Sequence, residues 1–251
     1  MKRHLKKIVL GIVALLVLVI AGSWFYTKVL NDPQDAKTAQ DAVDIVQGTT
    51  SDTTDDTTAD MTVETTSTAA ATTDALEGPV DGDWAPTSES ELCYRVKETI
   101  NGFATEGVGC TNVVSGAMTI EGTTLTSADF TVDMTTFTSD KTKRDESFNG
   151  KVMEVATYPT GTFVLTSPVD FGAVPADGET ITVTATGDLT LHGVTKSVTF
   201  DLSAAYGNDK IGVFGKIPVL FADYGIDNPS FAVVSTEDNG LLEFVLAFER
   251  A

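Results

Sequence analysis

The fold of this 251-residue chain is clearest in residues 181–205, which read ITVTATGDLTLHGVTKSVTFDLSAA. From Ile181 to Leu191, every second residue is apolar or glycine, and threonine or aspartate lies between them. The same alternation runs from Val198 to Ala204. One apolar and one polar face at period two is typical of antiparallel strands with one solvated side. The HGVT tetrapeptide between the two runs predicts a tight turn, so we expect a β-hairpin here.

The same period recurs across the C-terminal two thirds of the chain. It is present in residues 92–97, 128–135 and 242–249, and shorter apolar pairs near residues 163 and 211 indicate further strands. The sequence therefore predicts an all-β domain, an antiparallel lipocalin-like β-barrel of about eight strands, with a sandwich as the alternative.

One segment of the domain breaks the alternation. Phe148, Val152 and Val155 have helical spacing, and Asp145 or Ser147 offers a cap. Residues 145–156 are therefore expected to form a short helix between strands, ending before the YP dipeptide at 158–159.

The N-terminal region predicts a membrane anchor. Ile8–Thr27 is a run of twenty residues without a charge, long enough to cross a hydrocarbon core of about 30 Å. Four basic residues precede it, and only Lys28 follows closely, which places the N-terminus in the cytoplasm. We expect residues 1–30 to be a cytoplasmic tail and single transmembrane helix at the cell membrane, with the barrel on the extracytoplasmic side. A cleaved signal peptide is the alternative, and it also exports the domain.

Residues 31–82 are predicted to be a disordered linker, and residues 83–251 the barrel. Fourteen of the 25 residues from Thr49 to Thr73 are threonine or serine, interleaved with aspartate. Such a composition cannot bury enough apolar surface to offset the entropy of ordering. Residues 81–251 carry 25 acids and ten bases, so the domain repels phosphate backbones and we exclude nucleic acid as a partner.

Several motifs resemble one family. They are GDLTLHGVTK at 187–196, Arg144-Asp145 before the predicted helix, YPTGTF at 158–163, Tyr94-Arg95-Val96, and DYGI at 223–226. In this order they resemble the YceI-like proteins, the lipocalin-like polyisoprenoid-binding family. The resemblance implies a barrel with a long apolar tunnel that holds an apolar lipid such as a polyprenyl chain. Cys110 departs from the residue type usual at its position.

The candidate ligand-binding residues are the large apolar members of the inward faces, with two polar residues, of which His192 is expected at the tunnel mouth. The apolar candidates are Tyr94, Val96, Phe130, Val132, Phe163, Leu165, Val183, Leu189, Leu191, Phe200, Phe244 and Leu246. The polar candidates are His192 and Arg144. The alternative is that the apolar set packs a dry core, that His192 is a turn residue bonded to backbone, and that Arg144 pairs with Asp145 or orients the helix.

Cys93 and Cys110 are expected to form a disulfide, since both lie in the exported domain and a hairpin would bring them together. The alternative is two unpaired thiols. A zinc site is not expected, because these cysteines and His192 do not make four ligands.

No nucleophile motif is present, so we expect a binding protein without a cofactor rather than an enzyme. Two other hypotheses remain open. One is an enzyme acting on an isoprenoid or quinone, with His192 as acid or base. The other is an envelope stress or interaction protein whose barrel is filled by its own side chains.

Overall fold

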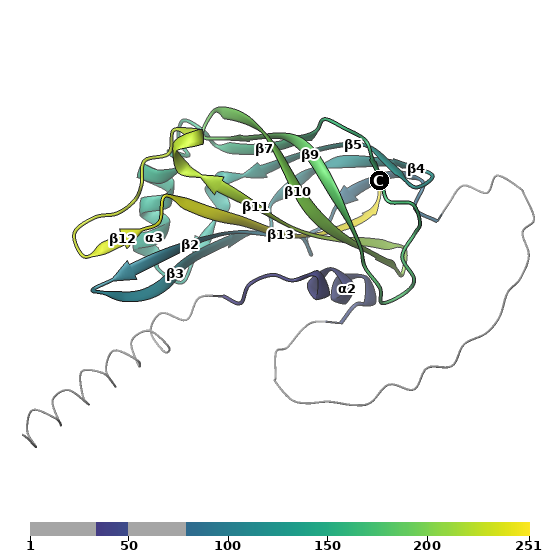
Figure 1. The fold of residues 1–251 in the computed structure, drawn as a ribbon, viewed down its shortest axis with the longest axis horizontal. Helices are drawn as coiled ribbons and strands as arrows, with labels where there is room; N and C mark the ends of the chain where they lie inside the picture. The colour runs from purple at the N-terminus through teal and green to yellow at the C-terminus, as the bar shows by residue number, and fades with distance from the viewer. Residues whose placement is uncertain (1–33, 50–78) are drawn as a thin grey trace, which may run out of the picture.

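The computed structural model describes residues 34–49 and 79–251 (Figure 1). The predicted transmembrane run, residues 8–27, lies outside the described residues, as does most of the predicted linker. In the part that is described, no helix has the length and apolar character needed to cross a bilayer.

The described strands form a single sheet of thirteen members, paired antiparallel throughout. They are β1 (Gly82–Pro86), β2 (Glu91–Ile100), β3 (Phe103–Thr111), β4 (Val114–Glu121), β5 (Thr124–Asp133), β6 (Thr138–Ser139), β7 (Thr160–Leu165), β8 (Val169–Asp170), β9 (Ile181–Leu191), β10 (Val194–Gly207), β11 (Lys210–Leu220), β12 (Val234–Thr236) and β13 (Asn239–Arg250).

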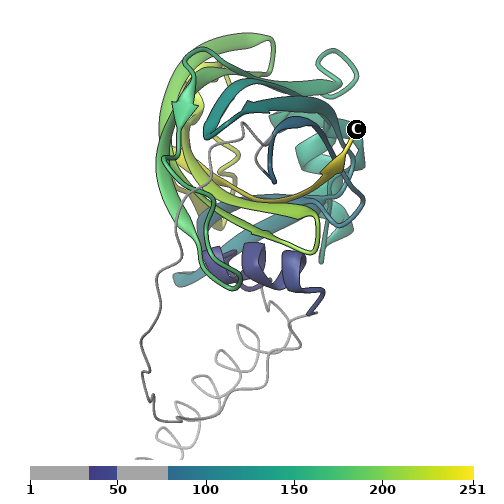
Figure 2. The ribbon, with the colours of Figure 1, turned by 90° about the vertical axis from the view of Figure 1, so that its right-hand side faces the viewer.

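Eight of these strands close into a barrel. The ring runs β1-β4-β5-β7-β9-β10-β11-β13 and closes because β1 pairs with both β4 and β13. Figure 2 shows the ring from one end. The predicted all-β, eight-stranded antiparallel barrel is confirmed.

The wall is built differently toward the other end. There β2 takes the place of β1 beside β13, β3 pairs with β2, and β6 pairs with β3. Helix α3 (Thr142–Ser147) and the π-helical turn η3 (Phe148–Val152) follow β6 at this end (Figure 1). The lumen is therefore bounded here partly by helical backbone.

The predicted hairpin is formed by β9 and β10. Leu191 pairs with Val194, and the two residues between them, His192 and Gly193, have φ values of 50° and 74°. Two positive φ angles in succession match the right-handed twist of the strands. On the solvated face, the hydroxyls of Thr190 and Thr195 lie 2.8 Å apart.

The predicted helix at 145–156 is displaced in the structure, where the helical residues are 142–152. Neither proposed side chain makes a capping hydrogen bond to it. Asp145 instead accepts a hydrogen bond from Ser139 Oγ at 2.6 Å, which ties the first turn to β6. Glu154 has a φ of 44°, a left-handed conformation that ends the helical run before Val155.

The prediction of a disordered linker over all of 31–82 is wrong for one segment, where the structure has helix α2 (Ala39–Gln47). Thr38 and Asp41 form a capping box, and Gly48 ends the helix in the left-handed conformation. The helix lies outside the barrel against β10 and β11 (Figure 2). It buries Ala42, Val43 and Val46, which gives it the tertiary packing that a short helix needs. We call residues 34–48 the clip.

Candidate functional site

The barrel contains two neighbouring apolar chambers. The outer chamber, about 300 Å³, lies between β2, α3–η3, the end of β11 and β12. The inner chamber, about 120 Å³, lies deeper in the closed ring. Met134, Phe137, Leu191 and Leu242 line both chambers, so the two meet at these side chains. The outer lining includes the exposed residues Phe231 and Lys143, and we call this opening the mouth.

Twelve of the fourteen predicted ligand-binding residues lie on this lining. In the outer chamber they are Tyr94, Val96, Arg144 and Leu191. In the inner chamber they are Phe130, Val132, Phe163, Leu165, Leu189, Leu191, Phe200, Phe244 and Leu246. Val183 and His192 line neither chamber. Val183 packs against the core at the start of β9.

Two glycines hold aromatic rings against the wall of the inner chamber. A Cβ at Gly187 would lie 2.4 Å from the Phe163 ring, and one at Gly215 would lie 2.4 Å from the Phe244 ring. Both rings therefore lie directly over glycine backbone, and any larger residue at these positions would displace them. This contact keeps two large side chains close to the sheet, where they occupy less of the lumen.

An aromatic cluster lies in the wall of the outer chamber. Tyr94 stacks on Phe148 with ring centroids 4.7 Å apart, and Phe137 packs against both rings. Burial raises the pKa of the Tyr94 phenol, so this hydroxyl stays neutral. The cluster joins β2 to η3 and adds a helical element to the chamber wall.

The mouth carries charged groups on one side. Arg144 forms an ion pair with Asp140, one turn earlier, rather than with Asp145. Lys141 and Lys143 also lie on the lining, together with Glu98. Burial raises the pKa of the Glu98 carboxyl, although nearby Arg144 acts in the opposite direction. The chamber is thus apolar within and polar at this rim.

His192 has the surroundings of a structural turn residue. Its Nδ1 lies 3.2 Å from the Tyr224 carbonyl oxygen, and its ring packs on Tyr158 with centroids 4.5 Å apart. Its Nε2 lies 3.4 Å from a Glu154 carboxylate oxygen. These contacts join the β9–β10 turn to two other loops, and they support the structural interpretation over a role in binding or acid–base chemistry.

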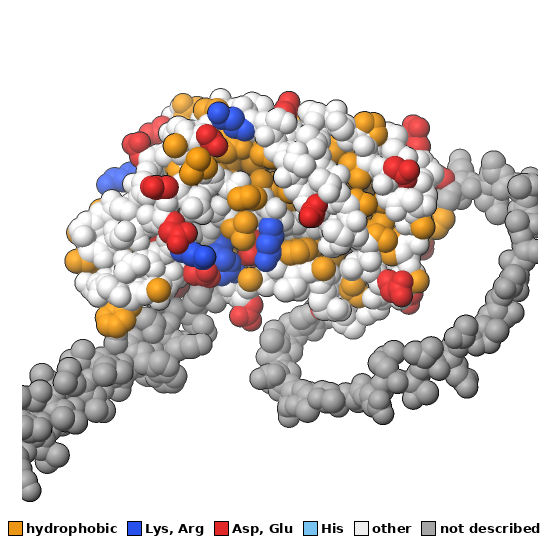
Figure 3. Space-filling model, viewed as in Figure 1, with side chains coloured by type: hydrophobic (Ala, Val, Ile, Leu, Met, Phe, Trp, Pro, Cys, Tyr) orange, Lys and Arg blue, Asp and Glu red, His pale blue; other side chains and the backbone are white. Residues whose placement is uncertain are grey.

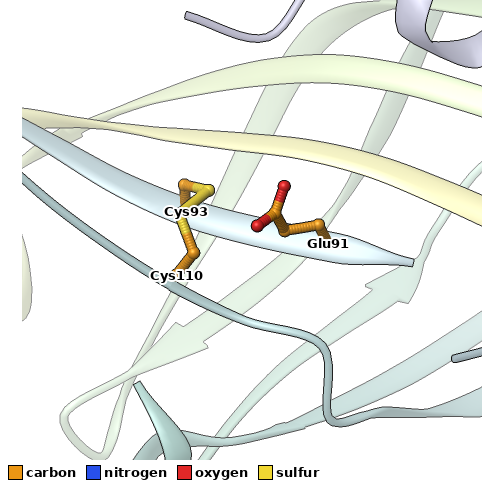
Figure 4. Close-up of side chains that lie close together, drawn as sticks. All are labelled: Glu91, Cys93 and Cys110. Carbon is orange, nitrogen blue, oxygen red and sulfur yellow. A yellow bond between two sulfur atoms is a disulfide. The ribbon is translucent and has the colours of Figure 1, made fainter. Parts of the chain in front are cut away.

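The predicted Cys93–Cys110 disulfide is confirmed, and it lies on the outer side of the barrel between β2 and β3. Glu91 lies beside it (Figure 4), with its carboxylate within 4.8 Å of both sulfur atoms. A disulfide has no thiolate to ligate zinc, and Glu91 is paired with Lys37. This group of residues is therefore a disulfide beside an ion pair, on the outer face of the barrel where Lys37 of the clip lies.

Sequence reasoning missed several lining residues outside the long strands. Phe137 follows the 3₁₀ turn η2 (Met134–Thr136), and Phe221 begins η4 (Phe221–Tyr224). Ile226 and Phe231 lie in the loop before β12. None of them belongs to an alternating run. Leu242 is different, because it lies on the inward face of a predicted strand and could have been selected.

The fold and the lining define a lipocalin-like barrel with an internal apolar cavity. The YceI-like domain model matches residues 84–248, so the chain belongs to the YceI-like family. This agrees with the motifs at 187–196 and 158–163.

Curated relatives and solved structures agree with this assignment. A UPF0312 protein of Vibrio parahaemolyticus is 32% identical over 102 residues, covering 38% of this chain and 50% of the relative. A UPF0312 protein of Pseudomonas fluorescens is 34% identical over 98 residues, covering 36% of this chain and 47% of the relative. The chain thus spans about half the length of the curated relatives it matches.

Two solved structures share the fold. A polyisoprenoid binding domain from Saccharophagus degradans has a TM-score of 0.54 at 20% identity and covers 68% of this chain and 99% of its own. Burkholderia cenocepacia BcnA has a TM-score of 0.51 at 21% identity and covers 64% of this chain and 98% of its own. At these identities the likeness establishes the fold alone.

Proposed function

We propose that the barrel binds an apolar, isoprenoid-like lipid on the extracytoplasmic side of a membrane, and that the run at residues 8–27 holds it there. The observation that carries the proposal is the pair of neighbouring apolar chambers, which share Leu191 and Leu242 in their walls. An apolar lining admits an apolar guest, because an unpaired polar group buried there would cost several kcal/mol. The Saccharophagus degradans domain, which shares the fold, is a polyisoprenoid binding domain, and a polyisoprenoid is a guest of this kind.

The dimensions favour a long and thin guest. An apolar cavity of roughly 150 Å³ accommodates one benzene ring. The inner chamber, at about 120 Å³, therefore fits the end of a chain, and the outer chamber, at about 300 Å³, fits a longer portion. In this arrangement the apolar end of the lipid passes Leu191 and the polar end remains at the mouth beside Arg144 and Lys143.

Blocking the junction tests the proposal. Leu191→Trp adds bulk where the chambers meet, and Val164→Trp adds the same side chain on the exposed outer face of β7. The purified proteins are incubated with dispersed radiolabelled polyprenol and the bound fraction is counted. We expect at least a tenfold loss of bound polyprenol for Leu191→Trp and none for Val164→Trp. Equal binding by both variants, or no binding by the unmodified protein, contradicts the proposal. Circular dichroism verifies that both variants fold.

A further inference from the structure

The clip runs along the barrel in a defined direction. At its start, the carbonyl of Gln34 accepts a hydrogen bond from Arg95 Nη2 at 2.8 Å. Lys37 then pairs with Glu91, four residues earlier on β2. Near its end, Asn208 Nδ2 donates to the Val46 carbonyl at 2.8 Å. Since β2 ends at Ile100 on the mouth side, the clip begins toward the mouth and leads away from it.

This path shortens the connection to the predicted membrane span. Only residues 28–33 separate the charge-free run from Gln34. Covalent geometry limits the distance between Thr27 and Gln34 to about 25 Å. A free linker over residues 31–82 would have allowed the barrel to move far from the bilayer. Because the clip is bonded to the barrel from Gln34 onward, the short segment 28–33 instead joins the predicted span to the side of the barrel nearer the mouth.

The loops at the mouth carry exposed apolar side chains. Phe231, Val233 and Phe103 are 69%, 58% and 47% exposed. They lie in two neighbouring tips, because Asn101 N donates to the Val233 carbonyl at 3.1 Å and Val234 pairs with Ile100. In Figure 3, apolar side chains are visible at this end of the molecule. Exposed apolar side chains beside a cavity opening are typical of an interaction surface.

The charge at the mouth differs from the charge of the domain. Residues 81–251 carry 25 acids and only ten bases, yet three of those bases, Lys141, Lys143 and Arg144, line the outer chamber. Glu98 is the acid on the same lining, Asp140 pairs with Lys141 and Arg144, and Asp145 and Glu146 lie on the same helix as Arg144. The mouth is therefore close to neutral in a strongly acidic domain, so it is the part of the domain that an anionic bilayer surface repels least.

We propose that the mouth docks on the bilayer that holds the chain, with Phe103, Phe231 and Val233 entering the headgroup region. The lipid then passes between the bilayer and the outer chamber without crossing water. This inference rests on the proposed function, because it takes both the apolar guest and the membrane-held N-terminal run from it.

Spin labelling of the full chain in nanodiscs of phosphatidylethanolamine and phosphatidylglycerol tests the docking. A nitroxide is attached at Val233→Cys, and in separate samples at Phe103→Cys and at Val164→Cys, with the native disulfide intact. Relative to position 164, we expect collisions with oxygen to increase at 233 and 103, and collisions with a water-soluble nickel chelate to fall at least threefold. The proposal is overturned if the nitroxide is equally accessible to oxygen and to the nickel chelate at all three positions. It is also overturned if the nitroxides at 233 and 103 are immobilised while the nickel chelate still reaches them, because that result indicates a protein partner.

Lipid uptake provides a second readout. Phe103→Ser/Val233→Ser removes two tip side chains that line neither chamber, and Val113→Ser/Val164→Ser is the matched control. We expect uptake of labelled polyprenol from the nanodisc to slow at least fivefold for the first pair only, with equilibrium binding of dispersed polyprenol unchanged. Unchanged uptake contradicts docking while leaving the binding function intact. Absence of any polyprenol binding contradicts the binding function, and the spin-label experiment still reports on docking.

Discussion

The two sides of strand β13 are both removed from water, but they meet different surroundings. On the inner side, Leu242, Phe244 and Leu246 face chambers that contain free space. On the outer side, Glu243 and Ala247 are fully buried although they face away from the lumen. Helix α2 of the clip packs against this strand, and Glu243 pairs with Arg95 and Lys216. Burial alone therefore does not distinguish a packed surface from a binding surface, whereas the space left beside the side chain does.

The largest expected effect comes from the buried charges on the outer side. Arg95 lies 3.1 Å from Glu243 and 2.7 Å from Glu106, and Glu243 is 0% exposed. Arg95→Leu leaves Glu243 with Lys216 alone, and we expect a loss of about 3–5 kcal/mol in the free energy of unfolding, measured by urea denaturation. The double variant Arg95→Leu/Glu243→Leu should recover much of this loss. A single variant as stable as the unmodified protein would show that the cluster is hydrated.

The disulfide on the outer side should contribute nearly as much. Cys93→Ala/Cys110→Ala opens a link between residues 17 positions apart. Chain entropy of the unfolded state then predicts a loss of about 3 kcal/mol. Because both sulfurs lie outside the lumen, polyprenol binding by the folded variant should not change. If the fully folded variant binds polyprenol more weakly, a change on the outer side of the wall alters the inner, binding side.

A matched pair of alanines compares the two sides directly. Ala185 lines the inner chamber and Ala247 lies on the outer side of β13, and both are 0% exposed. Ala185→Leu can use the free space, so we expect stability within about 1 kcal/mol of the unmodified protein and weaker polyprenol binding. Ala247→Leu enters a packed side and should lose about 1–3 kcal/mol. Thermal unfolding measures both, and equal losses would argue that the inner side is packed as well.

The smallest effect concerns a charge at the mouth. Burial raises the pKa of Glu98 in the folded protein, so its contribution to stability is present below the unfolded pKa and is lost as pH rises through the folded pKa. Glu98→Gln should therefore be more stable than the unmodified protein at pH 7, with the difference disappearing near pH 4. Thermal unfolding across this range measures the trend, and Glu237→Gln, at an exposed position, is the control. If the stability difference between Glu98→Gln and the unmodified protein grows as pH falls, the pKa of Glu98 is not raised in the folded protein.

The regular strands could be predicted because their alternation records one buried face and one solvated face. The 181–205 hairpin, the closed barrel and most of the inner chamber's lining follow from that rule. It does not extend to Phe137, Phe221 or Ile226, since turns position these side chains and turns have no fixed period.

The clip was missed for a different reason. Its residues lie in a polar segment, and only docking on the barrel makes a nine-residue helix stable. Two features could have indicated it. Thr38 and Asp41 have capping-box spacing before apolar residues at 42, 43 and 46, and Val245 and Ala247 are apolar on the side of β13 expected to face water.

The proposed lipid-binding interior is tested most directly by native mass spectrometry of the full chain purified from its own host in a mild detergent. We expect an adduct of one apolar lipid per chain, identified as isoprenoid-like after denaturing extraction, and its absence from Leu191→Trp. A protein that consistently carries no lipid and gains none from added polyprenols would contradict a hollow, guest-binding barrel.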